Sequence, residues 1–585
     1  MTKVLSDYPK LLEYLEENPS KRELAEKYLT EISANYSLAT VKKLERLFDA
    51  TFAKLYEKIN LETAEGVDIP QLQKDSHLIL CPNHQSYADF LGISYAVYKK
   101  YSLPVFIAAG MNLNVFPVGN LFRKGGAFFI RRSFKGEDLY KLVLEAYIYH
   151  LLKNQKIIKF YFEGGRSRTG RLLPPRYGLF HMLLEAYSHL PKDKPLCFLP
   201  ISISHETLPE ARAHSRESLG GKKIKESTWQ LVNLLSVMSK RFGSIHLKAG
   251  QPIFIKHVEE DRRAQVQDLA FACFRSVGKE MMISPTSLLS LVLLDNVSGA
   301  LTKKYIYSRC ESILAYARDF QIPLSPNLDG NGSQAIEDAL DLLIDSKKVE
   351  KIKSKTLDRT FYHVNPQARS ELLYLKNTIL HHFLIPHFIA SAWINIFRGS
   401  IDSLASLKHY FLEQRRMLKH EFYLPKSGEM FEQIRFLIAS IMQQPDFQFE
   451  QTFQVAKKDF YKLGQVVGPY SASFAHIYEA YYVAAQSLKS FIGTSFDFEA
   501  FQNVSKEVFQ VEKDLGKVVR YPEAYSVSIM RSALSYFAGE KIIEIVDENE
   551  FHMHHADKQM IDRMIEKFST QLSDITTLNL KKFHD

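Results

Sequence analysis

Residues 78–89 read Leu-Ile-Leu-Cys-Pro-Asn-His-Gln-Ser-Tyr-Ala-Asp: an apolar run, a short polar turn and the start of an aromatic-rich segment. The run is typical of a buried strand and the segment of a helix, which places His84 in a strand-to-helix loop and Asp89 in the first helical turn. Loops between rigid elements usually present the reactive side chains. Asp89 can hold one ring nitrogen of His84 and leave the other nitrogen to take a proton. We therefore predict that His84 is a general base and that Asp89 orients it.

The same spacing occurs a second time, in the C-terminal segment His552-Met-His-His-Ala-Asp557. The chain has 20 histidines, so one accidental pair is unsurprising. The second pair lacks a preceding apolar strand and a following arginine cluster. We predict that it has no catalytic role.

The composition limits the classes of protein to which this chain can belong. The chain has 585 residues, of which 46% are hydrophobic and 24% charged, which is typical of a globular protein with two or more domains. The net charge of +9 favours anionic partners such as phosphate esters, coenzyme A or acidic lipids. The basic residues are not interleaved with base-stacking aromatic residues, so we expect no nucleic acid partner. The four cysteines are scattered and predict buried thiols, with neither a metal site nor a disulfide framework.

The chain divides into three predicted regions. Residues 1–65 read as amphipathic helices, residues 66–285 alternate short apolar runs with helical patterns, and residues 286–585 are mainly helical. The alternation predicts an α/β domain with an internal sheet. Residues 327–333, rich in Asn and Gly, predict a loop. The predicted strands are Leu78–Cys81, Val105–Ala108, Ala127–Ile130, Ile157–Phe162, Leu196–Ile203 and Ile245–Lys248.

Two arginine clusters follow predicted strands. Arg131 and Arg132 come directly after Ala127–Ile130, and residues 163–170 read Glu-Gly-Gly-Arg-Ser-Arg-Thr-Gly after Ile157–Phe162. A glycine pair lets backbone amides approach a ligand, and guanidinium groups offer forked donors that match phosphate. Each cluster also has an interpretation without a ligand. The first cluster would then be solvated surface charge, and the second would be a turn stabilised by salt bridges. With the His84 dyad, the clusters predict proton abstraction from a hydroxyl of a phosphorylated substrate, which then attacks an activated electrophile.

Four blocks in order resemble the glycerol-3-phosphate / dihydroxyacetone-phosphate acyltransferase family, of the bacterial glycerol-3-phosphate 1-O-acyltransferase type. The resemblance covers residues 80–210 strongly and continues more weakly through Gly250-Gln-Pro-Ile and residues 377–390. Two positions depart from the pattern: Gln85 stands where the family commonly has Arg, and His205 where it commonly has Tyr. The blocks are the His84-x4-Asp89 pair, Gly-Ala-Phe-Phe-Ile-Arg131-Arg132, Phe-Glu163-Gly-Gly-Arg-Ser-Arg-Thr-Gly and Leu199-Pro-Ile-Ser-Ile-Ser.

The resemblance implies transfer of a fatty acyl group from acyl-CoA or acyl-ACP to the sn-1 hydroxyl of glycerol 3-phosphate, which gives lysophosphatidate in phospholipid synthesis. No cofactor beyond the donor is implied. By carry-over, His84 is the base, Asp89 orients it, and Glu163 and Gly164 help to place glycerol. The residues implied around the phosphate are Arg131, Arg132, Arg166, Ser167 and Arg168.

Three alternatives stay open: an acyltransferase for dihydroxyacetone phosphate, one for lysophosphatidate, and a non-catalytic binder of anionic lipids. We expect peripheral attachment to the cytoplasmic side of the inner membrane, because the substrates are lipids and the chain is basic. No signal-peptide pattern is seen, and the nearest apolar run, Thr378–Phe397, is broken by Pro386 and three histidines. We expect a buried or interfacial helix there.

Overall fold

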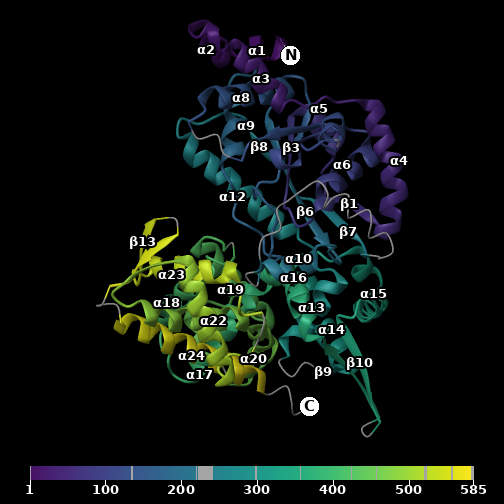
Figure 1. The fold of residues 1–585 in the computed structure, drawn as a ribbon. Helices are drawn as coiled ribbons and strands as arrows, with labels where there is room; N and C mark the ends of the chain where they lie inside the picture. Colours follow the sequence, from purple (N-terminus) through teal and green to yellow (C-terminus); the bar gives the residue numbers. More distant parts are fainter. Residues whose placement is uncertain are drawn as a thin grey trace.

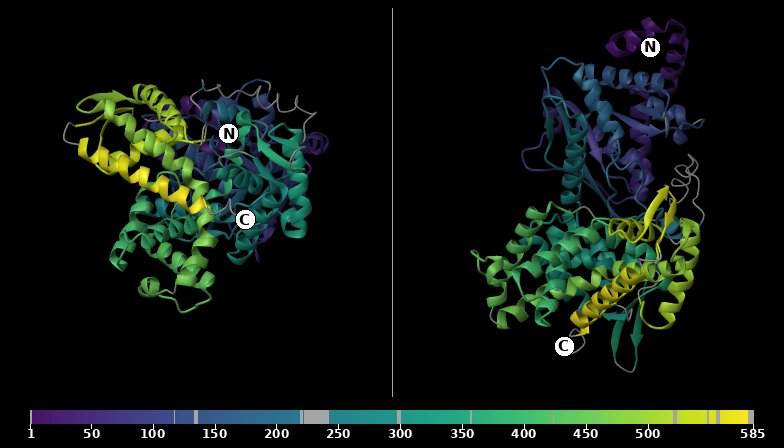
Figure 2. Two further views of the ribbon diagram at one scale, coloured as in Figure 1. Left: turned by 90° about the horizontal axis from the view of Figure 1, so that it is seen from below. Right: turned by 90° about the vertical axis from the view of Figure 1, so that its left-hand side faces the viewer.

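The structure is a computed structural model of the chain with three parts, ordered along the chain (Figure 1). A helical N-terminal segment leads into an α/β domain, and a larger helical C-terminal part follows. In the side view of Figure 2, the α/β domain and the C-terminal part are stacked one above the other. The structure describes residues 2–116, 118–132, 136–218, 221, 242–296, 300–355, 358–422, 424–455, 457–519, 523–547, 549–554 and 558–580.

One eight-stranded mixed sheet forms the centre of the α/β domain. Its strand order is β1-β7-β6-β2-β5-β3-β4, with β8 paired to β6 beside β7. The five strands from β2 to β6 run parallel to one another, whereas β7 and β8 run antiparallel to β6. The strands are β1 Ile59–Thr63, β2 His77–Pro82, β3 Val105–Gly110, β4 Ala127–Ile130, β5 Ile157–Lys159, β6 Leu196–His205, β7 Ile245–Ala249 and β8 Ile253–Ile255.

All six predicted strands are present in the central sheet, although β5 ends at Lys159 and not at Phe162, and two further strands of this sheet were not predicted. β1 lies in the segment 1–65, for which helices alone were expected, and it extends the sheet by pairing parallel with β7. Only Leu61 of β1 is buried, so its apolar signal is weak. β8 has three residues and a partly exposed edge position, which gives too short a pattern for a sequence reading.

Helices cover both faces of the sheet, so the predicted internal sheet is confirmed. Alternate side chains of β2 point to opposite faces: Leu78 and Leu80 join one apolar core, and Ile79 and Cys81 join the other. The helices that pack on the first core are α4 Leu38–Leu55, α5 Ile69–Asp75, α6 Tyr87–Tyr101 and α7 Val118–Lys124. Those on the second are α1 Thr2–Asp7, α2 Pro9–Glu17, α3 Arg22–Ile32, α8 Asp138–Lys153, α9 Gly178–Ser188 and α12 Arg262–Glu280.

The C-terminal part has one apolar core of its own and two small antiparallel sheets. The stretch 327–333, predicted as a loop, lies within α15 instead; only Asn331 leaves helical geometry there, at φ −146° and ψ 77°. The helices are α13 Pro285–Asp295, α14 Lys303–Asp319, α15 Pro326–Asp345, α16 Arg369–Ile379, α17 Leu384–Phe397, α18 Leu404–Leu418, α19 Ser427–Met442, α20 Lys457–Ser471, α21 Ala475–Leu488, α22 Phe498–Asp514, α23 Val527–Gly539 and α24 Lys558–Leu580. The strands are β9 Ala300–Thr302, β10 Val349–Ser354, β11 Arg359–Val364, β12 Ser495–Asp497, β13 Glu544–Asp547 and β14 Glu550–His552.

One helical stretch, Pro366–Phe397, is long and apolar enough to cross a membrane by length and composition. It includes α16 and α17, and 72% of its most apolar window is buried inside the C-terminal part. The Nε2 atoms of His381 and His382 lie 2.8 Å from the carbonyl oxygens of Gly278 and Met281, respectively. The packing is that of a core helix of the C-terminal part.

Candidate active site

The predicted dyad forms in the loop between β2 and α6. His84 Nδ1 lies 3.1 Å from Asp89 Oδ2, and the His84 side chain is 16% exposed while that of Asp89 is fully buried. Ser86 caps α6, with its side chain accepting from the Ala88 N–H, and Asp89 accepts from the backbone N–H groups of Gln85 and Ser86 at 2.6 and 2.8 Å. The loop is therefore fixed to the first turn of α6 by the carboxylate that also orients the base.

A second histidine, which the sequence reading did not assign, completes the environment of Asp89. His205, at the end of β6, places Nε2 at 2.6 Å from Asp89 Oδ1. Burial raises the pKa of Asp89, but His205 and then His84 lower it by more, and the net pKa is well below its usual range. Asp89 therefore stays ionised between two imidazoles, which fits a carboxylate that stabilises a charged His84.

The ring and backbone of His84 are held by the segment after β5. The imidazole stacks on Tyr161, with centroids 3.9 Å apart and planes 16° apart. Glu163 accepts from the His84 N–H at 2.6 Å and from the Leu173 N–H at 2.8 Å, and the Ser167 N–H donates to the His84 carbonyl at 2.8 Å. The segment after β5 thus positions the base from three sides.

The carboxyl of Glu163 contacts the backbone of two segments of the α/β domain. Both of its oxygens accept from backbone N–H groups, so it joins the His84 loop to the segment 163–173. Burial raises its pKa to about 8, although the hydrogen bonds from the two N–H groups lower the pKa. Gly164 follows at φ +70°, where a Cβ would meet the side chain of Arg176. A contact of either residue with glycerol stays a prediction.

The second arginine cluster lies beside the dyad, as predicted, and α10, Ala211–Ser218, covers it. The Arg166 guanidinium stacks 3.5 Å above the Tyr87 ring, and its Nη1 lies 3.4 Å from His214 Nε2 and 3.9 Å from a Glu210 oxygen. Arg168 Nε lies 3.4 Å from Glu217 Oε2. Burial, followed by the charges of Arg168 and Arg166, lowers the pKa of His214 to about 3, so His214 is neutral here.

Arg131 and Arg132 are not brought to the dyad. They follow β4 at the edge of the sheet, and β5 and β3 separate β4 from β2. The Arg131 guanidinium forms ion pairs with Glu31 of α3 and with Glu137, and it stacks between two tyrosine rings. Arg132 is exposed. These contacts give Arg131 a role in joining the N-terminal helices to the sheet, and a phosphate contact of the pair stays a prediction.

The C-terminal part contacts the arginine loop, residues 166–171, directly, and no sequence pattern predicts this contact. The Tyr374 hydroxyl donates to the Ser167 carbonyl at 3.3 Å, and the Asn377 amide donates to the Thr169 carbonyl at 2.8 Å. Gly170, at φ +85°, faces the Tyr374 carbonyl so closely that a Cβ would lie 2.1 Å from it. Arg171 forms a buried ion pair with Glu421. Residues more than 200 positions along the chain thus fix the loop.

Lys159 is a buried lysine that the sequence analysis did not predict as part of the site. Lys159, the last residue of β5, donates to the Phe90 carbonyl at 2.9 Å and to Ser94 Oγ at 3.0 Å. Burial lowers its pKa to about 7, partly opposed by Asp89. Its two acceptors both lie on α6, so it ties β5 to the helix that carries Asp89 and is a positioning group.

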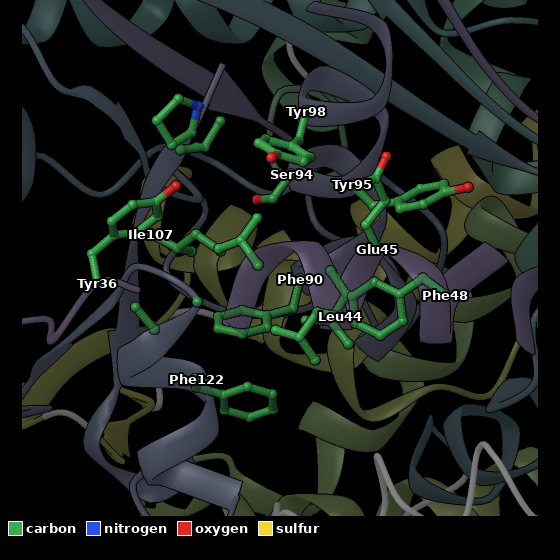
Figure 3. Close-up of a pocket in the computed structure, with 16 residues that line it drawn as sticks. Tyr36, Leu44, Glu45, Phe48, Phe90, Ser94, Tyr95, Tyr98, Ile107 and Phe122 are labelled. Atoms are coloured by element: carbon green, nitrogen blue, oxygen red, sulfur yellow. The ribbon is translucent and has the colours of Figure 1, made fainter. Parts of the chain in front are cut away.

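An apolar pocket lies on the other side of α6, between α4, α7 and the ends of β3 and β4 (Figure 3). Its volume is about 60 Å³. Leu44, Phe48, Phe90 and Phe122 line it together with tyrosine side chains, and Glu45 is its one charged residue. Such a lining suits an alkyl chain and not a phosphate.

Two further sequence predictions concern metals and the C-terminal pair. Among the described residues, no group of three or more His, Cys, Asp or Glu is placed to hold a metal ion. His552 lies in β14, with Nδ1 2.9 Å from the Ser495 hydroxyl, while Asp557 lies outside the described residues. A non-catalytic role for this pair stays a prediction.

The sequence is similar to known protein families along most of its length. Residues 65–204 match the family described as acyltransferase, and residues 215–546, more than half of the chain, match the one described as glycerol-3-phosphate acyltransferase C-terminal region. The chain belongs to the glycerol-3-phosphate acyltransferase family. The first match spans β2 to β6 with the dyad and both arginine clusters, and the second spans most of the helical part that holds the arginine loop.

Two curated relatives illustrate the likeness. The glycerol-3-phosphate acyltransferase of Shewanella sp. (strain MR-4) is 31% identical over 459 residues, which are 74% of this chain and 53% of the relative. That of Shewanella oneidensis is 34% identical over 397 residues, 64% of this chain and 48% of the relative. The chain thus spans about half the length of the curated relatives it matches. A solved 1-acyl-sn-glycerophosphate acyltransferase from Thermotoga maritima is 19% identical, covering 40% of this chain and 78% of that one with a TM-score of 0.25.

Proposed function

We propose that the protein transfers a fatty acyl group from an activated thioester to the sn-1 hydroxyl of glycerol 3-phosphate. The observation that carries this is the His84–Asp89 pair at 3.1 Å, with Asp89 kept ionised by two imidazoles. A thioester is already activated, so an oriented hydroxyl and one proton transfer suffice for the reaction. The family membership and the names of the relatives support this acceptor.

In this proposal, His84 Nε2 takes the proton of the acceptor hydroxyl while the oxygen attacks the thioester carbon. Asp89 stabilises the imidazolium that forms, as His84 Nδ1 faces its carboxylate. The acceptor phosphate binds at Arg166 and Arg168, which lie on the loop whose Ser167 N–H holds the His84 carbonyl. When the tetrahedral intermediate collapses, the C–S bond breaks and the imidazolium returns its proton to the leaving thiolate. The products are 1-acyl-glycerol 3-phosphate and a free thiol.

The apolar pocket beside α6 supports a place for the acyl chain. Phe90, which lines it, is the neighbour of Asp89 in the chain. A cavity of about 60 Å³ holds only a few methylene groups, so a long chain requires the surrounding side chains to move. Leu44→Trp, which fills the pocket from α4, should lower kcat/KM for long-chain donors more than for short-chain ones. An equal loss of kcat/KM for donors of every chain length would contradict the binding of the acyl chain in this pocket.

The membrane is the proposed location of the reaction, with peripheral attachment on the cytoplasmic side. Support comes from the net charge of +9 and from the lipid nature of the product. The apolar stretch Pro366–Phe397 is mostly buried in the C-terminal part and is not required as an anchor. Carbonate or high salt should release much of the protein from membranes, and full retention after both washes would contradict this location.

The acceptor assay tests the proposed function. Purified protein is mixed with palmitoyl-CoA and one acceptor at a time: glycerol 3-phosphate, dihydroxyacetone phosphate or lysophosphatidate. Thiol release that depends on glycerol 3-phosphate, with a 1-acyl product, is the expected result. A preference for another acceptor would replace glycerol 3-phosphate as the proposed substrate. If no thiol is released with any acceptor, from either palmitoyl-CoA or acyl-ACP, the protein would instead be a non-catalytic binder of anionic lipids.

A further inference from the structure

His214 is a buried histidine of α10 that lies beside the arginine loop and against the C-terminal part. Only 1% of its surface is exposed, and its Nε2 atom lies 3.4 Å from Arg166 Nη1. We propose that its other ring nitrogen, Nδ1, donates a hydrogen bond to the phosphate of the acceptor, in the site formed by Arg166 and Arg168. This inference rests on the proposed function, because it adds a phosphate-binding residue to the same site.

The contact with Arg166 determines which ring nitrogen of His214 carries the proton. A guanidinium group only donates hydrogen bonds, so His214 Nε2 accepts from Arg166. Burial, followed by the charges of Arg168 and Arg166, lowers the pKa of His214 to about 3 and keeps the ring neutral. A neutral imidazole that accepts at Nε2 carries its proton on Nδ1. Nδ1 of His214 is therefore a hydrogen-bond donor at neutral pH.

This donor lacks an acceptor within the described part of the chain. The Nδ1 atom of His214 is buried and has no hydrogen-bond partner there. A buried N–H group without an acceptor destabilises a folded protein, and the great majority of such groups in native structures have a partner. Arg168 and Arg166 are the charged groups that act most strongly on the ring. An acceptor that fits beside two guanidinium groups is an anion, and a phosphate oxygen meets this requirement.

Two carboxylates beside His214 contact the arginines in this structure. Glu217 Oε2 lies 3.4 Å from Arg168 Nε, and Glu210 Oε1 lies 3.9 Å from Arg166 Nη1. Both distances exceed the roughly 2.7–2.9 Å of a charge-assisted hydrogen bond. Glu210 also accepts from the N-cap and the first residue of α6, which fixes its position. Glu217 is therefore the carboxylate that competes with an incoming phosphate for Arg168.

The C-terminal part supports His214 and the arginine loop through one residue. The ring of Tyr374 lies against the His214 ring, with centroids 5.5 Å apart, and its hydroxyl donates to the Ser167 carbonyl at 3.3 Å. Leu208, Ala211 and Tyr374 also form a small apolar cluster. These contacts hold α10 and the loop at a fixed distance from each other. The imidazole and the two guanidinium groups can therefore bind the same phosphate.

Calorimetry on the full chain with glycerol 3-phosphate, without an acyl donor, tests this role independently of catalysis. His214→Phe keeps a ring against Tyr374 but removes the donor, and should raise the Kd about tenfold. His214→Gln keeps an N–H donor and should recover part of the affinity. Glu217→Gln removes the competing charge and should lower the Kd. The matched control is His77→Phe, since His77 is buried at the first residue of β2, at the end of the strand opposite to the dyad, and should stay within about twofold.

A spectroscopic measurement on the wild type covers the case in which His214→Phe does not fold. With ¹⁵N-labelled histidine, the Nδ1 resonance of His214 should shift when glycerol 3-phosphate or inorganic phosphate is added, and should not shift with glycerol. A shift with both phosphate compounds supports the contact. A resonance that stays unchanged at saturating glycerol 3-phosphate overturns it.

The outcomes separate the role of His214 from the proposed function. An unchanged Kd in a folded His214→Phe protein overturns the assignment, as does an equal loss of affinity in His214→Phe and His214→Gln. Weaker binding in Glu217→Gln contradicts the competition for Arg168. Binding of glycerol 3-phosphate that depends on His214, without acyl transfer from any donor, would support the role of His214 and contradict the proposed function. Acyl transfer with an unchanged acceptor KM in His214→Phe would support the function and overturn the role of His214.

Discussion

His205 Nε2 lies 2.6 Å from Asp89 Oδ1, on the side of the carboxylate opposite to His84. Both side chains of this contact are almost completely buried. His205→Leu removes the donor and leaves a carboxylate oxygen unpaired, which costs about 1–3 kcal/mol for a buried group. We expect kcat to fall about tenfold or more with the KM for the acceptor little changed. His205→Gln keeps an N–H donor and should recover part of kcat. Equal activity of the Leu variant and the wild type would show that Asp89 needs only His84.

The two arginine clusters should behave differently. Arg166→Ala and Arg168→Ala each remove a charge-assisted contact to phosphate, worth roughly 1.5–3 kcal/mol, so the KM for glycerol 3-phosphate should rise about ten- to a hundredfold. The KM for the donor should change little. Arg131→Ala is the comparison: its guanidinium is paired with Glu31 and Glu137, so it should lower the melting temperature and leave the acceptor KM within about threefold. A large rise of the acceptor KM in Arg131→Ala would show that Arg131 contributes to binding of the acceptor phosphate.

The contact between the C-terminal part and the arginine loop should matter for acceptor binding. Asn377→Ala removes the hydrogen bond to the Thr169 carbonyl, and the loop that carries Arg166 and Arg168 then loses one of its supports. We expect the KM for glycerol 3-phosphate to rise about three- to tenfold, with less change in the donor KM. Asn365→Ala, which removes a hydrogen bond from the Gln367 N–H in the turn before α16, is the control. If Asn377→Ala lowers the stability of the protein without any change in the acceptor KM, Asn377 contributes to packing and not to acceptor binding.

The carboxyl of Glu163 provides a pH-dependent contribution to stability. Its pKa is raised from 4.5 to about 8, chiefly by burial. Between these values the folded protein holds a proton that the unfolded chain has released, so this contribution is present at low pH and is lost as the pH rises through about 8. The free energy of unfolding of the wild type, measured against Glu163→Gln, should fall between pH 5 and pH 8 by up to about 1.4 kcal/mol per pH unit. A flat difference across this range would mean that the backbone N–H groups of His84 and Leu173 keep the carboxyl ionised.

The sequence predicted the sheet and the dyad because both depend on local patterns. An apolar run followed by a polar turn is enough to place His84 and Asp89 in a strand-to-helix loop. The partners of Arg131 could not be predicted in this way, since Glu31 lies 100 residues earlier in the chain. His205 departs from the family pattern, but its contact with Asp89 depends on the pairing of β6 beside β2 and follows from no local pattern. Helix α10, which covers Arg166, follows no recognisable motif.

The most direct test is steady-state kinetics of His84→Ala, with glycerol 3-phosphate and palmitoyl-CoA varied in turn. The substitution removes the group placed to take the hydroxyl proton, and general-base assistance contributes typically ~10²–10⁴-fold. We predict that kcat falls by at least ~10²-fold, with the acceptor KM within about threefold and an unchanged melting temperature. Turnover within about tenfold of the wild type in a folded His84→Ala protein would contradict the assignment of His84 as the base.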